Sequence, residues 1–320
     1  MNWSRKMINP VLDKEFRLRM RSTRSMLSVL FYVLALSAVA MGYIYIFLYL
    51  GQNNSQRFDP TTSRMMFYVL SFAQLILIAF MAPALTAGVI SSEREKQTLS
   101  MLLTTQQSSS TIVLSKLVSS LSFMALIVLA TLPVYSIVFL YGGISPKQLV
   151  SVFLFYLFVM LLLGSLGVMF STLFKRTIVA IIVTYGAGLI IFLVTGLLFL
   201  FFMGIEQRNL MMSGVQPTGQ TYSWVGYLMG LNPGGALISL FEPSFSKEAF
   251  MMRGGTISSK PPIQLWLEFV SVYSVVIIIA LWIAIRRIRP VRRGKLFGKP
   301  KAPKTPNITK AEVIPEEQTT

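Results

Sequence analysis

The sequence predicts an all-α integral membrane protein with six transmembrane helices and with both the N and the C terminus in the cytoplasm. Three observations predict this class. Of the 320 residues, 54% are hydrophobic and only 13% are charged, too few charges to cover the surface of a soluble protein. The apolar residues gather into runs of membrane length. The basic residues gather beside alternate ends of those runs, as they do in cytoplasmic loops of membrane proteins.

Six apolar segments are long enough to cross a bilayer, which needs roughly 20 helical residues. They cover approximately 27–50, 66–90, 117–140, 148–174, 177–203 and 263–285. Before the fourth segment, Ser145 and Pro146 supply a capping hydroxyl and a first-turn proline. Pro83 and Pro133 fall inside the second and third segments and should kink them, either to shape a path or simply to pack.

The distribution of Lys and Arg fixes the predicted orientation. The N-terminal arm, 1–26, holds seven, the 91–116 loop three, the turn at 175–176 two and the tail, 286–320, ten. The other three loops together hold only seven. The first set is therefore predicted to be cytoplasmic. The tail is basic near the membrane and then rich in proline and acids, so we expect it to be disordered beyond about Lys295.

An uncharged run of 18 residues, Trp224 to Phe241, competes for the place of a seventh span. The sequence Asn232-Pro233-Gly234-Gly235 breaks it into two pieces that are too short to cross. We therefore predict short interfacial or re-entrant helices within an extracellular region, 204–262.

The N-terminal arm has an amphipathic pattern from Asn9 to Arg24. Asn9 and Pro10 are typical of a helix start, and Leu12, Phe16 and Met20 share one face, with basic residues off it. A helix of this kind lies flat under anionic lipid headgroups, so membrane lipids are expected partners. The plainer interpretation is a topology anchor, and the two roles are compatible.

One compact charged segment, SSEREKQTLSMLLTT, lies at 91–105 between the second and third spans. Ser92 and Glu95 fit a capping box, and Leu99, Leu102 and Leu103 share one face at helical spacing. The pattern predicts a short amphipathic cytoplasmic helix at about 92–105. The plainer interpretation is an interfacial helix that only connects two spans.

The stretch Glu93 to Leu99, followed by Leu102-Leu103-Thr104 and by Ile112 to Lys116, resembles a segment of the ABC-2 permease family, the membrane subunits of type-2 ATP-binding cassette transporters. That family reads Glu-Arg-Glu-Lys-Gly-Thr-Leu-Glu, then Leu-Leu-x-Thr-Pro and Gly-Lys. This chain departs from the pattern at Gln97, Thr105 and Ser115. FSTLFKRTIVA, 170–180, resembles the family's second cytoplasmic turn, and LNPGGALISL loosely matches its Asn-Pro element before the last span.

The resemblance implies the permease subunit of an ATP-driven transporter, expected to be an exporter. It implies two copies of an ABC-type ATPase subunit and a second permease copy or a paralogue as partners. The 92–105 helix would be the coupling helix: its leucines would seat in the ATPase, and Glu93, Arg94 and Glu95 would fix the register. The turn at Lys175 and Arg176 would join this contact. In the family the second and fifth spans partly line the path, which makes these residues candidates for the path: Gln74, Thr184, Tyr185 and Thr195.

The residue types that are absent argue against catalysis by this chain. It has no His and no Cys, and it lacks the Gly-x-x-x-x-Gly-Lys-Ser/Thr phosphate loop. We therefore expect no catalytic residue, cofactor or metal here, with ATP and Mg bound by the partner ATPase. Glu268, the one acid inside a predicted span, is expected to reach the interface. The basic residues lie beside apolar segments, which favours a membrane surface over nucleic acid.

A non-transporting six-span sensor, scaffold or assembly factor is the alternative function. The absence of Cys from the extracellular region fits a bacterial plasma membrane.

Overall fold

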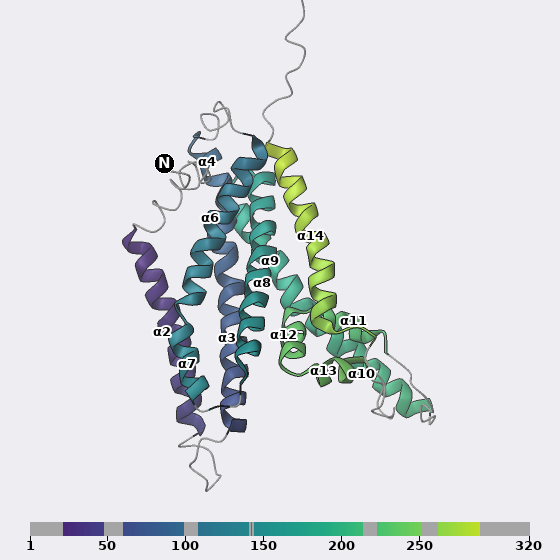
Figure 1. Ribbon diagram of the computed structural model, residues 1–320. Helices are drawn as coiled ribbons and strands as arrows, with labels where there is room; N and C mark the ends of the chain where they lie inside the picture. The colour runs from purple at the N-terminus through teal and green to yellow at the C-terminus, as the bar shows by residue number, and fades with distance from the viewer. Residues whose placement is uncertain are drawn as a thin grey trace, which may run out of the picture. The chain divides into compact units, whose positions relative to one another are not determined.

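The structure is a computed structural model that describes residues 22–47, 60–98, 108–140, 142, 144–213, 223–250 and 262–288. The chain divides into two units, 1–288 and 289–320, and all of these residues belong to the first. Within them every regular element is a helix (Figure 1). The helices are α2 (Thr23–Tyr45), α3 (Pro60–Thr86), α4 (Ser91–Glu95), α6 (Ser109–Leu129), α7 (Leu132–Leu140), α8 (Pro146–Leu173), α9 (Thr177–Leu189), η3 (Ile190–Val194), α10 (Thr195–Ser213), α11 (Val225–Gly230), α12 (Pro233–Phe241), α13 (Pro243–Phe250) and α14 (Leu265–Ile288).

The six predicted spans are confirmed by six helical stretches that are long and apolar enough to cross a membrane. In chain order they contain α2, α3 with α4 at its end, α6 with α7, α8, α9 with η3 and α10, and α14. The cytoplasmic placement of both termini stays a prediction. The predicted amphipathic arm with Leu12, Phe16 and Met20, and the tail beyond Ile288, lie outside the described residues.

The fourth span, α8, packs against α3, α6, α9, α12 and α14 and so forms the centre of the bundle (Figure 1). Its side chains Tyr156, Val159 and Leu163 are fully buried in the largest hydrophobic cluster. Gly167 lets α8 approach α3 closely, because a Cβ at this position would lie 2.1 Å from Thr86 Oγ1. Small residues at such crossings allow close packing of helices in a membrane.

The third span is broken, as Pro133 predicts. Helix α6 ends at Leu129 and α7 begins at Leu132, with Thr131 at the break. The Thr131 hydroxyl donates to Val128 O at 2.6 Å, and the Gln74 side chain from α3 donates to the hydroxyl at 3.2 Å. Thr131 N also donates to Val128 O, and Val134 N donates to Thr131 O, so backbone turns and the Thr131 hydroxyl together satisfy polar groups at the break.

The segment between the fifth and sixth spans forms the short helices α11, α12 and α13, which confirms that Trp224 to Phe241 is not a seventh span. Asn232 caps α12 by accepting from Gly234 N at 2.8 Å, with Pro233 in the first turn. The fifth span continues as helix to Ser213, ten residues beyond its predicted end at 203. Hydropathy falls there, but Glu206 and its neighbours stay helical, and the Ser223 hydroxyl donates to the Glu206 carboxylate.

Candidate functional site

Helix α4 lies after the second span and bonds to three other spans at one end of the bundle (Figure 1). We call these bonds, from residues 90–95 to Lys116 on α6, to residues 171–174 at the end of α8 and to Thr177 on α9, the α4 clamp. The clamp contains the three charged residues that the sequence singles out, Glu93, Arg94 and Glu95.

The first part of the clamp joins α4 to the C-terminal end of α8. The Ser171 hydroxyl accepts from Ile90 N and Ser91 N, both at 2.9 Å. Arg94 in turn donates through Nη2 to Thr172 O at 3.2 Å and through Nη1 to Phe174 O at 3.4 Å. The two elements therefore satisfy each other's terminal backbone groups, and the guanidinium lies at the negative end of the α8 dipole.

The second part of the clamp joins α4 to the first residue of α9. The Glu95 carboxylate accepts from Thr177 N at 2.7 Å and from Thr177 Oγ1 at 2.9 Å. The residue before α9, Arg176, makes no side-chain cap of its own. Glu95 thus takes the place of a capping side chain for the fifth span, and its negative charge lies at the positive end of that helix.

The third part of the clamp is an ion pair between α4 and the third span. Lys116 Nζ lies 2.5 Å from Glu93 Oε1, and the lysine side chain is only 3% exposed. A buried ammonium of this kind requires its partner, because an unpaired charge in a low-dielectric interior is strongly unfavourable. Glu93 therefore keeps α4 against α6.

The structure corrects two local predictions about this segment. Ser92 and Glu95 form no capping box, because Ile90 is the N-cap of α4 and Glu95 is engaged by Thr177. The predicted continuous helix over 92–105 is also wrong, because α4 ends at Glu95. Gln97 follows in the left-handed region with φ 57°, and Gln97 N and Thr98 N donate to Arg94 O and Glu93 O. This is a Schellman motif, in which the left-handed position usually holds glycine.

The remaining predicted contact residues lie at the edge of the clamp or beyond it. Lys175 and Arg176 are exposed on the turn between α8 and α9. Leu99, Leu102 and Leu103 fall outside the described residues, so their seating in an ATPase stays a prediction. Because Glu93, Arg94 and Glu95 are bonded within the chain, the role that we propose for them below differs from the one that the resemblance implies.

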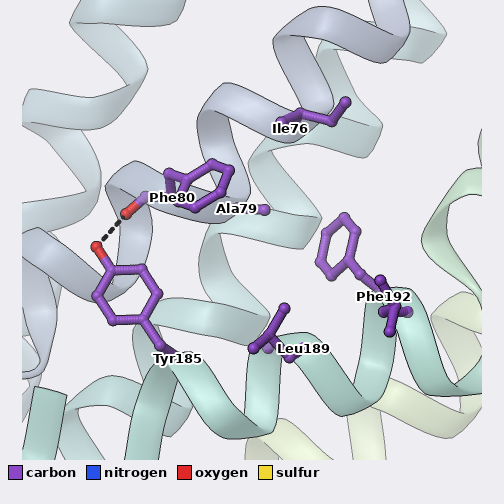
Figure 2. A pocket seen from close by; sticks show the side chains of 8 residues that line it. Ile76, Ala79, Phe80, Tyr185, Leu189 and Phe192 are labelled. Carbon is purple, nitrogen blue, oxygen red and sulfur yellow. Dashed lines mark hydrogen bonds between the residues drawn. The ribbon is translucent and has the colours of Figure 1, made fainter. Parts of the chain in front are cut away.

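A groove of about 260 Å³ lies between the second and fifth spans. Figure 2 shows Ile76, Ala79 and Phe80 of α3 facing Tyr185, Leu189 and Phe192 across it. Gly188 and Leu193 complete the lining. The one phenol, Tyr185, donates to Phe80 O at 2.8 Å, so the remaining wall is almost entirely apolar. Such a wall suits an apolar or amphipathic molecule and offers nothing to an ion.

Of the four predicted path residues, only Tyr185 lines this groove. Gln74 and Thr184 are fully buried, the first against Thr131 and the second bonded to Ala180 O of its own helix. Thr195 bonds to Asn232. The prediction from the sequence favoured polar residues and so missed Phe80 and Phe192. Residues 186–194 are all apolar, so their spacing could not single out Phe192.

A family model described as "ABC-2 family transporter protein" matches residues 9–288, a range that includes both the clamp and the groove. Among curated proteins, none matches the chain. In the described part of the chain, no group of three or more His, Cys, Asp or Glu is placed to hold a metal ion.

Proposed function

The chain belongs to the ABC-2 transporter family, and from this premise we propose that it is the permease subunit of an ATP-driven exporter. In this proposal two permease chains, identical or paralogous, form the path, and two copies of a separate ATPase bind ATP and Mg and hydrolyse the nucleotide. The permease chain itself carries out no catalytic step. The expected location is a bacterial plasma membrane.

The observation that carries the proposal is the α4 clamp. Through Ser91, Glu93, Arg94 and Glu95 a helix of five residues bonds at once to the third span, the end of the fourth and the start of the fifth. The stretch that holds the predicted docking leucines, Leu99, Leu102 and Leu103, lies between α4 and α6 in the chain. A push on that segment by the ATPase would therefore move α4 and the spans bonded to it together. The charged residues attach α4 to the spans, and the leucines bind the ATPase.

The groove is the proposed contact surface for the substrate. It lies between α3, which precedes α4 in the chain, and the fifth span, whose first residue Glu95 holds. Large apolar side chains on its rim remain open: Phe80 is 62% exposed, Leu189 58% and Leu193 55%. A second permease copy facing this surface would enclose a shared apolar path, in keeping with the small number of charges along these spans.

Affinity purification from native membranes in a mild detergent separates this proposal from the scaffold alternative. The proposal predicts a Walker-motif ATPase at stoichiometric yield with the permease. A matched preparation with Leu102→Ser and Leu103→Ser should retain insertion but lose stimulation of ATP hydrolysis, since an anchoring leucine at a packed contact contributes on the order of 2 kcal/mol. Repeated recovery of the chain without such an ATPase would favour the scaffold. Normal stimulation of ATP hydrolysis by the double variant would contradict the role of the two leucines in binding the ATPase.

A further inference from the structure

The fifth span contains a π-helical turn, η3, between α9 and α10. A π turn inserts one extra residue into an α-helix and disrupts the regular i to i−4 bonding at that point. Phe192 and Leu193 belong to this turn and also line the groove. The conformation of the turn therefore determines how these two side chains face α3.

Asn232 supports the turn from the side of the short helices. Its Nδ2 donates to Phe192 O at 2.7 Å and to Thr195 Oγ1 at 3.0 Å, while its Oδ1 accepts from Gly234 N at 2.8 Å. The side chain is only 8% exposed. Both amide protons and the amide oxygen are thus used, and one side chain joins the cap of α12 to the backbone of the fifth span.

The residues around Asn232 leave space for its side chain and bond to it and to the neighbouring backbone. A Cβ at Gly196 would lie 3.0 Å from Asn232 Nδ2, so glycine leaves the amide its space. The Thr195 hydroxyl donates to Ile191 O at 2.6 Å while it accepts from Asn232. On the other side, Tyr273 of α14 donates to Leu231 O at 2.9 Å and so ties the neighbouring backbone to the sixth span.

We propose that Asn232 is a positioning residue for the groove, because it holds the π turn that presents Phe192 and Leu193. A π turn departs from the regular i to i−4 bonding, and the amide of Asn232 donates to a carbonyl within this turn, Phe192 O. Without this bond the turn can return to regular α-helix. In that change, the part of the helix after the turn rotates by roughly 100° relative to the part before it, so the residues that line the groove no longer face α3 together. The proposal rests on the proposed function only in taking the groove as the substrate's surface.

The variant Asn232→Ser separates the two roles of the residue. Serine caps a helix about as well as asparagine, so α12 keeps its cap, but its hydroxyl is too short to reach Phe192 O. Thr195→Val tests the same latch, the bonds from Asn232 to Phe192 and Thr195, from the other side. Thr184→Val is the matched control, because the Thr184 hydroxyl makes the same bond to a carbonyl four residues earlier, to Ala180 O at 2.6 Å, without bonding to Asn232.

Hydrogen exchange of the full chain in lipid nanodiscs measures the latch without any ATPase. We expect Thr195→Val to speed exchange over 189–198 roughly five-fold, the equivalent of one lost hydrogen bond, and Asn232→Ser, which removes both bonds, to speed it at least as much. Exchange over 233–241 should be unchanged in Asn232→Ser, and exchange over both regions should be unchanged in Thr184→Val. Unchanged exchange over 189–198 in a folded Asn232→Ser protein would reduce Asn232 to a helix cap and overturn the proposal. If Asn232→Ser does not fold, Thr195→Val decides by the same criterion.

Maleimide labelling of Leu193→Cys then tests the groove itself. The chain has no cysteine of its own, so the label reports one position. We expect Asn232→Ser to change the labelling rate at least as much as it changes exchange, and an unchanged rate would overturn the positioning role. Failure of the ATPase to co-purify would contradict the proposed function, but exchange and labelling would still decide whether the latch exists, because neither measurement requires the ATPase.

Discussion

Gln97 occupies a backbone position that favours glycine. Its φ of 57° closes α4, and the family pattern that this segment resembles has glycine at the same place. A residue with a side chain loses roughly 1–2 kcal/mol of stability in the left-handed region. Glycine avoids this strain but loses more chain entropy on folding, so its net advantage at this position is smaller. The departure from the family pattern therefore carries a local energetic cost without changing the turn.

We predict that Gln97→Gly raises the free energy of unfolding by about 0.5–1 kcal/mol because it relieves this conformation. The control is Lys96→Gly at the preceding residue, where φ is −78° and glycine gains nothing. Titration with sodium dodecyl sulfate, followed by circular dichroism, measures both variants. A destabilised Gln97→Gly protein would show that α4 does not end in this turn.

The Glu93–Lys116 pair is predicted to stabilise the fold only as a pair. Lys116→Met leaves Glu93 without this partner and should lower the free energy of unfolding by about 2 kcal/mol, a value reduced from the fully buried case because Glu93 is 26% exposed. Adding Glu93→Gln should recover part of the loss, and Lys147→Met, at an exposed lysine, should change little. Strictly additive effects in this double-mutant cycle would contradict the pairing.

At the scale of elements, helix caps were predicted correctly where the hydrogen-bond partners lie within the same segment. Ser145 caps α8 by accepting from Gln148 N at 3.2 Å, with Pro146 in the first turn, as predicted. The capping box at Ser92 and Glu95 failed because Glu95 is engaged by Thr177, 82 residues away. No spacing rule within one segment can show such a competitor, so the α4 clamp could not be predicted, although Glu93, Arg94 and Glu95 were singled out.

The contact between α3 and α8 gives a prediction at this scale. Gly167→Ala places a Cβ 3.0 Å from Thr86 Cβ and 3.2 Å from Ala87 N, so the helices must separate, and we expect a loss of about 1–3 kcal/mol in the free energy of unfolding. Gly186→Ala is the control, since its Cβ would meet nothing within 4 Å and alanine is the better helix former. Detergent unfolding compares the two. Equal stability of the two variants would show that the helices do not cross this closely.

At the scale of the whole molecule, hydropathy and the break at Asn232-Pro233 were enough to predict six spans. Membrane thickness requires roughly 20 consecutive apolar residues in each transmembrane helix, and such runs can be counted in the sequence. The groove was predicted only in part. The family resemblance pointed to a path lined partly by the second and fifth spans, and Tyr185 was among the candidate residues named for it. Phe80 and Phe192 were missed because apolar residues in an apolar span carry no signal until the packing shows which of them remain uncovered.

Nucleotide-dependent labelling tests whether the α4 clamp carries motion from an ATPase to the groove. In the complex reconstituted with its ATPase, addition of ATP should change the maleimide labelling rate of Leu193→Cys. Glu95→Ala, which removes the cap on α9, should abolish the ATP-dependent change while the ATPase stays bound, whereas the neighbouring Lys96→Ala should preserve it. If Glu95→Ala leaves the full ATP response at Leu193→Cys, the clamp does not transmit the motion.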